Sequence, residues 1–346
     1  MTMKVTHYYI YIGVLAAGML LAGCSKDSGD STQQVGGEPQ EIRVQTNVTS
    51  MLKGSRATTI NSNSQLQTYD LKIDAYYNGT NEKYLDATKL HYTGGDPTWV
   101  FWDGSAQLHY YWPIDGSTVT IAGNPTTAST LDFVGFCPFE KPSYIGDPTY
   151  DHSTGVSFTA NMADYMTLAR QTGAEAPTIP IMQEFLVSWL PNQTLATQTA
   201  AAGGALPMVF KHPFALIKFT ITAASGTHVK INSISINGLK TAGTCTFDGS
   251  DMTWTGLTGS TDMTITQELK VGETTETSNF LVIPNNYDSK YLTVNATWDD
   301  WSNTVTISDY GTNVDFNWQA GYIYTYNLTL DKLGLKVDIA KYTEQW

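Results

Sequence analysis

Alternation of apolar and polar residues at a period of two is the feature that most constrains the fold of this chain. It recurs in short runs rich in Val, Ile, Thr, Tyr and Trp, and some runs end at a turn signal such as Asn78-Gly79 or Asn237-Gly238. The clearest runs are Tyr69–Tyr77, Ser117–Ile121, Val229–Ile236 and Tyr291–Trp298. Strands that alternate in this way, with turns every roughly 8–12 residues, are typical of antiparallel β-sandwiches.

The sequence therefore predicts an all-β protein, and its 346 residues leave room for two β-sandwich domains in tandem. Helical periodicity is nearly absent, and the best helix candidate is the short segment Asn161–Gln171. Residues 191–205 are small and polar, so we place the connection between the domains there. The predicted N-terminal sandwich then covers residues 41–195 and the C-terminal sandwich residues 196–346.

The N-terminus has the pattern of a secretory signal peptide that ends at a cysteine. Lys4 precedes an apolar run over residues 8–21, which is too short to span a membrane as a helix. The run leads into Leu21-Ala22-Gly23-Cys24, which resembles the lipobox of bacterial lipoproteins. We predict that residues 1–23 are removed and that Cys24 carries a diacylglycerol with fatty acids such as palmitate. A chance cysteine after an ordinary signal peptide is the alternative.

Composition excludes several classes of partner. The chain has a formal net charge of −13 and no basic run, which argues against binding to nucleic acid. Residues 24–40 are polar and predict a flexible tether. Beyond the lipobox only Cys137 and Cys245 remain, and neither belongs to a CxxC or Cys/His cluster, so no metal site is indicated. Two separate buried thiols are favoured over one disulfide.

Motifs of catalysis are missing from the sequence. No HExxH, GxSxG, P-loop or GxGxxG unit occurs, so neither an enzyme nor a cofactor is predicted. Aromatic residues are abundant, with 9 Trp, 20 Tyr and 12 Phe. The favoured interpretation is that they fill sandwich cores and form cross-strand pairs. The alternative is a surface glycan-binding lipoprotein with an aromatic binding platform.

Several segments, in order along the chain, together resemble the fimbrillin family, the subunits of type V pili. The most specific is Val209–Phe219, and a second segment carries Glu184 where the family usually has Asp. The segments are Tyr110–Pro113 with Leu131–Pro138, Gln183–Ser188, Val209–Phe219, Phe280–Pro284 and Trp318–Tyr326. The resemblance implies two Greek-key sandwiches of transthyretin-like fold and a structural subunit exposed at the outer membrane, in a fimbrium. His212 stands among phenylalanines, which predicts a buried, hydrogen-bonded histidine with a structural role.

The family also implies a mechanism of assembly. In fimbrillins an arginine-specific protease removes an N-terminal segment that includes a first strand, and a strand from a neighbouring subunit fills the groove. Here residues 41–48 alternate, with Ile42, Val44 and Val48 on one face, and form the candidate displaced strand. Arg56 follows in a polar stretch, so the candidate cleavage lies between Arg56 and Ala57. An uncut arginine in a loop is the alternative.

The C-terminus supplies the matching candidate donor strand, residues 333–346. Leu333, Leu335, Val337 and Ile339 alternate with other residues and would share one face of a strand. The last strand of the protein's own sandwich is an equally favoured interpretation. The partners implied are other pilin subunits, the outer membrane through the lipid on Cys24, and a host or bacterial surface receptor or glycan. Stalk, anchor and tip subunits are not distinguished.

Overall fold

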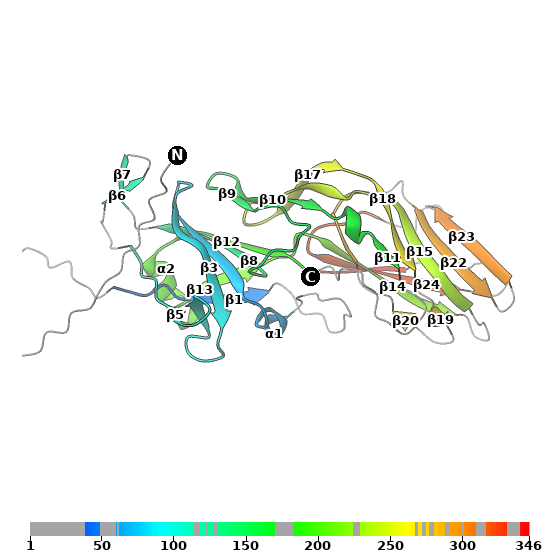
Figure 1. Cartoon of the computed structure of the whole chain (residues 1–346), viewed down its shortest axis with the longest axis horizontal. Helices are drawn as coiled ribbons and strands as arrows, with labels where there is room; N and C mark the ends of the chain where they lie inside the picture. Colours follow the sequence, from blue (N-terminus) through cyan, green and yellow to red (C-terminus); the bar gives the residue numbers. More distant parts are fainter. Residues whose placement is uncertain are drawn as a thin grey trace, which may run out of the picture. The chain divides into compact units, whose positions relative to one another are not determined.

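Strands make up nearly all of the regular structure in the computed structural model (Figure 1). The all-β prediction is confirmed, whereas the division into two tandem sandwiches stays a prediction. The helical elements are the short α1 (Asn63–Leu66), α2 (Leu195–Ala200), η1 (Ala163–Tyr165) and η2 (Ala202–Gly204). The structure describes residues 39–48, 60, 62–113, 118–121, 124–127, 130–169, 183–223, 229–266, 269–271, 275–276, 280–287, 291–298, 301–308, 316–330 and 340–345.

An antiparallel sheet of six strands, in the order β12-β8-β2-β3-β4-β5, organises the first half of the chain. Its members are β2 (Leu71–Tyr77), β3 (Lys83–Tyr92), β4 (Trp99–Trp102), β5 (Gln107–Leu108), β8 (Leu131–Cys137) and β12 (Leu186–Gln193). All seven residues of β8 are buried. Leu131 and Phe133 belong to one hydrophobic cluster, and Val134 and Phe136 belong to another. This sheet is therefore covered on both faces, and each face contributes to a different core.

The first core is closed by a two-stranded parallel sheet made of β1 (Val44–Val48) and β13 (Leu206–Phe210). Leu206, Met208 and Phe210 of β13 are buried in the same cluster as Leu131 and Phe133 of β8. β13 follows the predicted boundary between residues 195 and 196 but packs with the N-terminal strands. The boundary between the two sandwiches stays a prediction. A separate hairpin is formed by β6 (Thr118–Ile121) and β7 (Asn124–Thr127).

The second core is enclosed by three further sheets. One has the order β17-β16-β10-β9 and consists of β9 (Thr149–Asp151), β10 (Gly155–Asn161), β16 (Ala242–Phe247) and β17 (Met252–Thr258). The next sheet consists of β11 (Thr167–Ala169), β15 (Val229–Leu239), β18 (Thr261–Thr266), β19 (Leu269–Val271), β22 (Tyr291–Trp298) and β23 (Trp301–Ser308). Figure 1 shows β15, β22 and β23 of this sheet side by side. The last sheet consists of β14 (Ala215–Ala223), β20 (Thr275–Glu276), β21 (Phe280–Val282), β24 (Tyr322–Leu330) and β25 (Ala340–Gln345).

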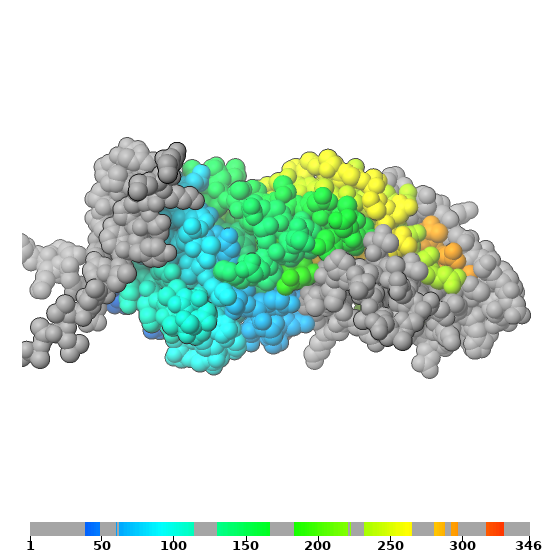
Figure 2. Space-filling model, in the orientation of Figure 1, coloured from blue at the N-terminus to red at the C-terminus, as the bar shows by residue number. Residues whose placement is uncertain are grey.

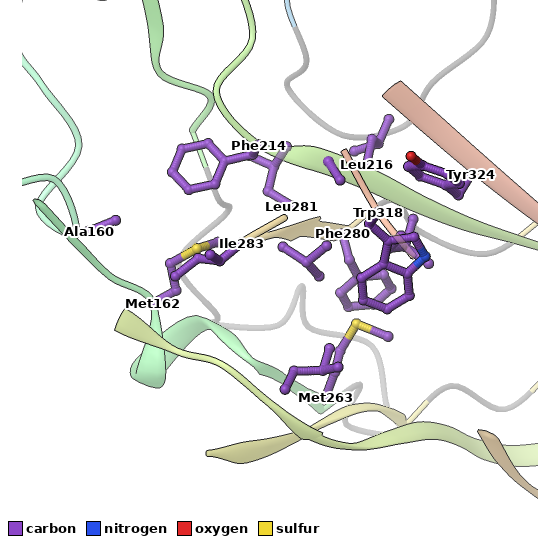
Figure 3. Close-up of a cluster of buried hydrophobic side chains, with 14 of the residues drawn as sticks. Ala160, Met162, Phe214, Leu216, Met263, Phe280, Leu281, Ile283, Trp318 and Tyr324 are labelled. Atoms are coloured by element: carbon purple, nitrogen blue, oxygen red, sulfur yellow. The ribbon is translucent and has the colours of Figure 1, made fainter. Parts of the chain in front are cut away.

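Aromatic and aliphatic side chains from these sheets and from the segments that connect them meet in the second core (Figure 3). Phe214, Phe280, Trp318 and Met263 are all fully or almost fully buried there. The indole N–H of Trp318 donates to the hydroxyl of Tyr326 at 2.8 Å, so this large side chain is buried with its polar group satisfied. This core explains much of the aromatic content of the sequence.

Two local predictions were wrong. The predicted helix Asn161–Gln171 is instead the end of β10, the 3-10 turn η1 and strand β11 over its described residues. Met162 and Met166 are both buried, which gives a helical spacing, but pairing of β11 with β18 overrides it. The predicted turn at Asn237-Gly238 is an irregularity inside β15, where the register shifts and Gly238 has a φ of 60°.

The prediction for the two cysteines is confirmed. Cys137 and Cys245 are both buried and free. Burial raises the pKa of each thiol, and the neighbouring Glu184 carboxyl acts in the same direction on Cys137. Among the described residues, no helix is long and apolar enough to cross a membrane.

Candidate functional site: the groove of the first strand

The first strand is paired along its length to a strand far away in the sequence. β1 runs parallel to β13, with Val44 opposite Leu206 at one end and Val48 opposite Phe210 at the other. One residue earlier, the N–H of Leu206 donates to the carbonyl of Arg43 at 2.8 Å. No local turn connects these two strands, so β1 is held by the tertiary fold alone.

Two further segments bind the ends of the same strand. Just before β1, the N–H of Ile42 donates to the carbonyl of Tyr110 at 2.7 Å, and the N–H of Trp112 donates to the carbonyl of Gln40 at 2.9 Å. At the other end, the last N–H of β1 donates to Oδ1 of Asn63, in α1, at 2.9 Å. The stretch that contains β1 thus has partners from three separate places in the chain.

Side chains of this stretch alternate between the core and the surface. Ile42 is 2% exposed and Val44 is 3% exposed, and both belong to the first core. Val48 is half-buried against the same cluster, whereas Arg43 and Asn47 face solvent. Burying an aliphatic side chain of this size contributes about 1.5–3 kcal/mol, so Ile42 and Val44 are the main apolar contribution of the strand.

A buried amide, Gln198 of α2, clamps the start of the strand. Its Oε1 accepts from the N–H of Arg43 and from the indole N–H of Trp112, both at 2.9 Å, and its Nε2 donates to the carbonyl of Glu41 at 2.9 Å. Gln198 does not stand out in the sequence, because residues 191–205 resemble a polar loop. The available signal was the pair Thr194 and Thr197, which form a capping box at the start of α2.

A second buried polar group, the carboxyl of Glu184, joins Ile60 to His212. Glu184 is fully buried; its Oε2 accepts from the N–H of Ile60 at 2.5 Å, and its Oε1 pairs with Nδ1 of His212. Burial raises the pKa of the Glu184 carboxyl, while the His212 ring and the Ile60 N–H act in the opposite direction. The prediction of a buried, hydrogen-bonded His212 is confirmed, and the pair fixes Ile60 in place.

The structure describes only part of the residues that the sequence singled out. It places Val44 and Val48 on β1 and Ile42 two residues before that strand, and all three side chains lie in or against the first core. Within the candidate donor strand 333–346, the described part is β25, which pairs antiparallel with β24 of the same chain, with Ala340 opposite Asn327. The remaining predicted residues lie outside the described residues, namely Cys24, Arg56, Ala57, Leu333, Leu335, Val337 and Ile339.

Comparison with solved structures shows that this arrangement of strands is a known fold. A fimbrial protein from Bacteroides vulgatus matches with a TM-score of 0.57 at 14% identity, over 89% of this chain and 99% of that one. A protein described as a putative cell adhesion protein from Bacteroides ovatus matches with a TM-score of 0.51 at 12% identity, over 89% of this chain and 98% of that one. No curated protein matches the chain.

Comparison with models of protein families shows the family to which the chain belongs. The model of the fimbrillin-like family matches residues 55–346, which is most of the chain. The protein belongs to the fimbrillin-like family. The segments that carried the resemblance in the sequence lie inside the matched range, and the first strand precedes it.

Proposed function

We propose that the protein is a structural, non-enzymatic subunit of a cell-surface fimbria, delivered as a lipoprotein through Cys24 and assembled by strand addition. Membership of the fimbrillin-like family and the likeness to a fimbrial fold support a pilus or adhesion subunit. The observation that carries the assembly mechanism is β1, whose apolar side chains are buried in a groove built entirely by residues distant in the sequence.

Removal of β1 would create an acceptor for another strand. The edge of β13 that pairs with β1 would lose its partner, and the positions of Ile42 and Val44 would become an empty apolar slot. An unpaired edge next to such a slot selects an extended strand with alternating apolar residues. Leu333, Leu335, Val337 and Ile339 have this alternation and are the proposed donor from a neighbouring subunit.

The position of Ile60 supports cleavage after Arg56. Ile60 is buried and anchored through Glu184, only a few residues beyond the proposed cut. A cut between Arg56 and Ala57 would separate β1 from the chain while leaving this anchor within the processed subunit. The strand would be lost, and the rest of the first core would keep its covalent continuity.

The test uses the chain from residue 24 with Cys24→Ser, which removes the lipid. Treatment with an arginine-specific protease should yield a chain that begins at Ala57 and forms ladders on denaturing gels without boiling. Arg56→Ala should block both processing and ladders, and the matched variant Arg170→Ala should block neither. A processed protein that stays monomeric and still retains residues 41–48 would contradict the mechanism.

The lipid gives a second readout in cells. Mass spectrometry of assembled surface protein that begins at Ala57 supports a stalk or tip subunit, because the lipid is then lost with the first strand. A chain that begins at lipidated Cys24 supports an anchor subunit. A chain that begins at neither residue would contradict the proposed route.

A further inference from the structure

A second hollow in the molecule lies apart from the groove of β1. It has a volume of about 670 Å³ and lies at the meeting point of four segments: the residues directly after β13, the turn between β16 and β17 with the start of β17, the stretch after β21, and the approach to β24. β17 itself lies at the surface, in yellow in Figure 2. The volume falls within the range of roughly 300–1,000 Å³ that is typical of small-molecule sites.

Three aromatic side chains line this cleft, namely Trp254, Tyr322 and the almost fully buried Trp318. Trp254 of β17 and Tyr322 of β24 are both half-buried and both pack on the second core. The indole N–H of Trp254 donates to the carbonyl of Pro213 at 2.8 Å, and its ring lies 5.3 Å from the ring of Phe214. The core therefore holds the indole in a fixed position. A ligand that stacks on it does not have to immobilise this side chain, which lowers the entropy cost of binding.

Side-chain amides supply the polar part of the lining. Asn286, Asn317 and Gln319 all line the cleft, and all three are exposed. Asn286 and Asn317 are opposite each other in an isolated antiparallel bridge, which fixes their spacing. An amide both donates and accepts hydrogen bonds, so this set suits a ligand whose groups do the same, as hydroxyls do.

Charge in the cleft is balanced. Lys211 and Asp251 are the fixed charges among the lining residues. The ammonium of Lys211 donates to the carbonyl of Ser250 at 2.9 Å and so already has a partner. His212 lines the cleft as well, but its ring is buried against Glu184. A lining with no excess of either charge offers little to a phosphate, sulfate or carboxylate group.

We infer that this cleft is a binding site for a neutral oligosaccharide. A sugar ring has an apolar C–H face that packs on an indole and hydroxyls around its rim that pair with amides. Trp254 offers the surface for the C–H face, and the amides of Asn286, Asn317 and Gln319 offer hydrogen-bond partners for the hydroxyls. Trp254, Asn286, Asn317 and Gln319 all lie away from β1 and β13, although Lys211 and His212 directly follow β13. Variants of Trp254 and Gln319 therefore test ligand binding without altering the strands of the assembly proposal.

The test measures binding of the lipid-free chain, with Cys24→Ser, to an array of immobilised neutral and acidic oligosaccharides. The soluble form of the strongest neutral ligand is then titrated by calorimetry. Gln319→Ala removes one exposed amide and should weaken binding roughly fivefold. Trp254→Phe reduces the stacking face and should weaken it roughly tenfold. Gln107→Ala in β5, also an exposed amide and outside the cleft, should leave the affinity unchanged.

Several outcomes would overturn the inference. They are the absence of any bound neutral oligosaccharide, a preference for acidic ones, or an affinity that Gln319→Ala and Trp254→Phe both leave intact. Thermal melting of each variant checks that it folds, and Gln319 is exposed, so its loss leaves the core untouched. Both variants should still form protease-dependent ladders, which separates failure of this site from failure of strand assembly.

Discussion

The first and last strands of the described chain are held in different ways. β1 and the four residues before it have partners in β13, residues 110–112, α1 and α2, and they bury Ile42 and Val44 in the first core. β25 lies at the end of its sheet and, among the described strands, pairs with β24 alone. To leave the fold, the N-terminal strand must therefore break contacts with several segments, whereas the C-terminal strand has one described strand interface to open.

Removing each terminal strand should give the largest difference. A chain that begins at Ala57 should lose about 3–6 kcal/mol of unfolding free energy relative to one that begins at residue 24, because Ile42 and Val44 no longer fill the core. A chain that ends at Ile339 should lose less. Urea denaturation of the three lipid-free chains measures both changes, and equal losses would remove the contrast between the two strands.

A charge placed in the groove should have the next largest effect. Val44→Asp buries an unpaired carboxylate and should cost about 3 kcal/mol or more. The cost has an upper limit, since the strand can leave the groove, so it should not exceed the loss on truncation. Asn47→Asp, on the exposed side of the same strand, is the matched control and should change the denaturation midpoint little.

Loss of the amide clamp should be smaller. Gln198→Ala leaves the backbone N–H of Arg43 and the indole N–H of Trp112 without their acceptor, and it should lower the unfolding free energy by about 2–3 kcal/mol. It should also speed protease-triggered assembly, because β1 is then easier to displace. Gln107→Ala serves as control. An unchanged stability of Gln198→Ala would show that α2 does not hold the strand.

Hydrogen exchange should reveal the smallest of these differences in the intact chain. Amides of β1 should exchange roughly tenfold more slowly than amides of β25, because opening β1 requires displacing more partners. Mass-spectrometric exchange on peptides covering the two strands measures this ratio. A ratio below one would reverse the comparison and make the C-terminal strand the more firmly held of the two.

Alternation in the sequence was enough to predict these strands, because successive side chains of a strand point to opposite faces of the sheet. Tyr291–Trp298 is a strand over its full predicted length, and Ile42 and Val44, which alternation assigns to one face, are both buried. Spacing alone failed at positions four residues apart, because such residues share a face both in a helix and in a strand. The buried pair Met162 and Met166 has helical spacing, but strand pairing with distant residues determines the backbone there.

The pairing partners of the candidate site could not be predicted from the sequence. Nothing local connects Val44 with Leu206, and the role of Gln198 depends on where α2 packs. Glu184 and His212 stood in motifs of the family resemblance, but their mutual contact and the anchored Ile60 emerge only from the fold. Such contacts join residues far apart in sequence, and the periodicity of a single segment carries no information about them.

Strand β8 has a consequence for the behaviour of a subunit under load. All seven of its residues are buried; Leu131, Phe133 and Cys137 belong to the first core, and Val134 and Phe136 belong to the second. A tensile force that pulled this strand out of one core would withdraw it from the other at the same moment. We therefore expect the two cores to yield together in a single mechanical event, rather than one after the other.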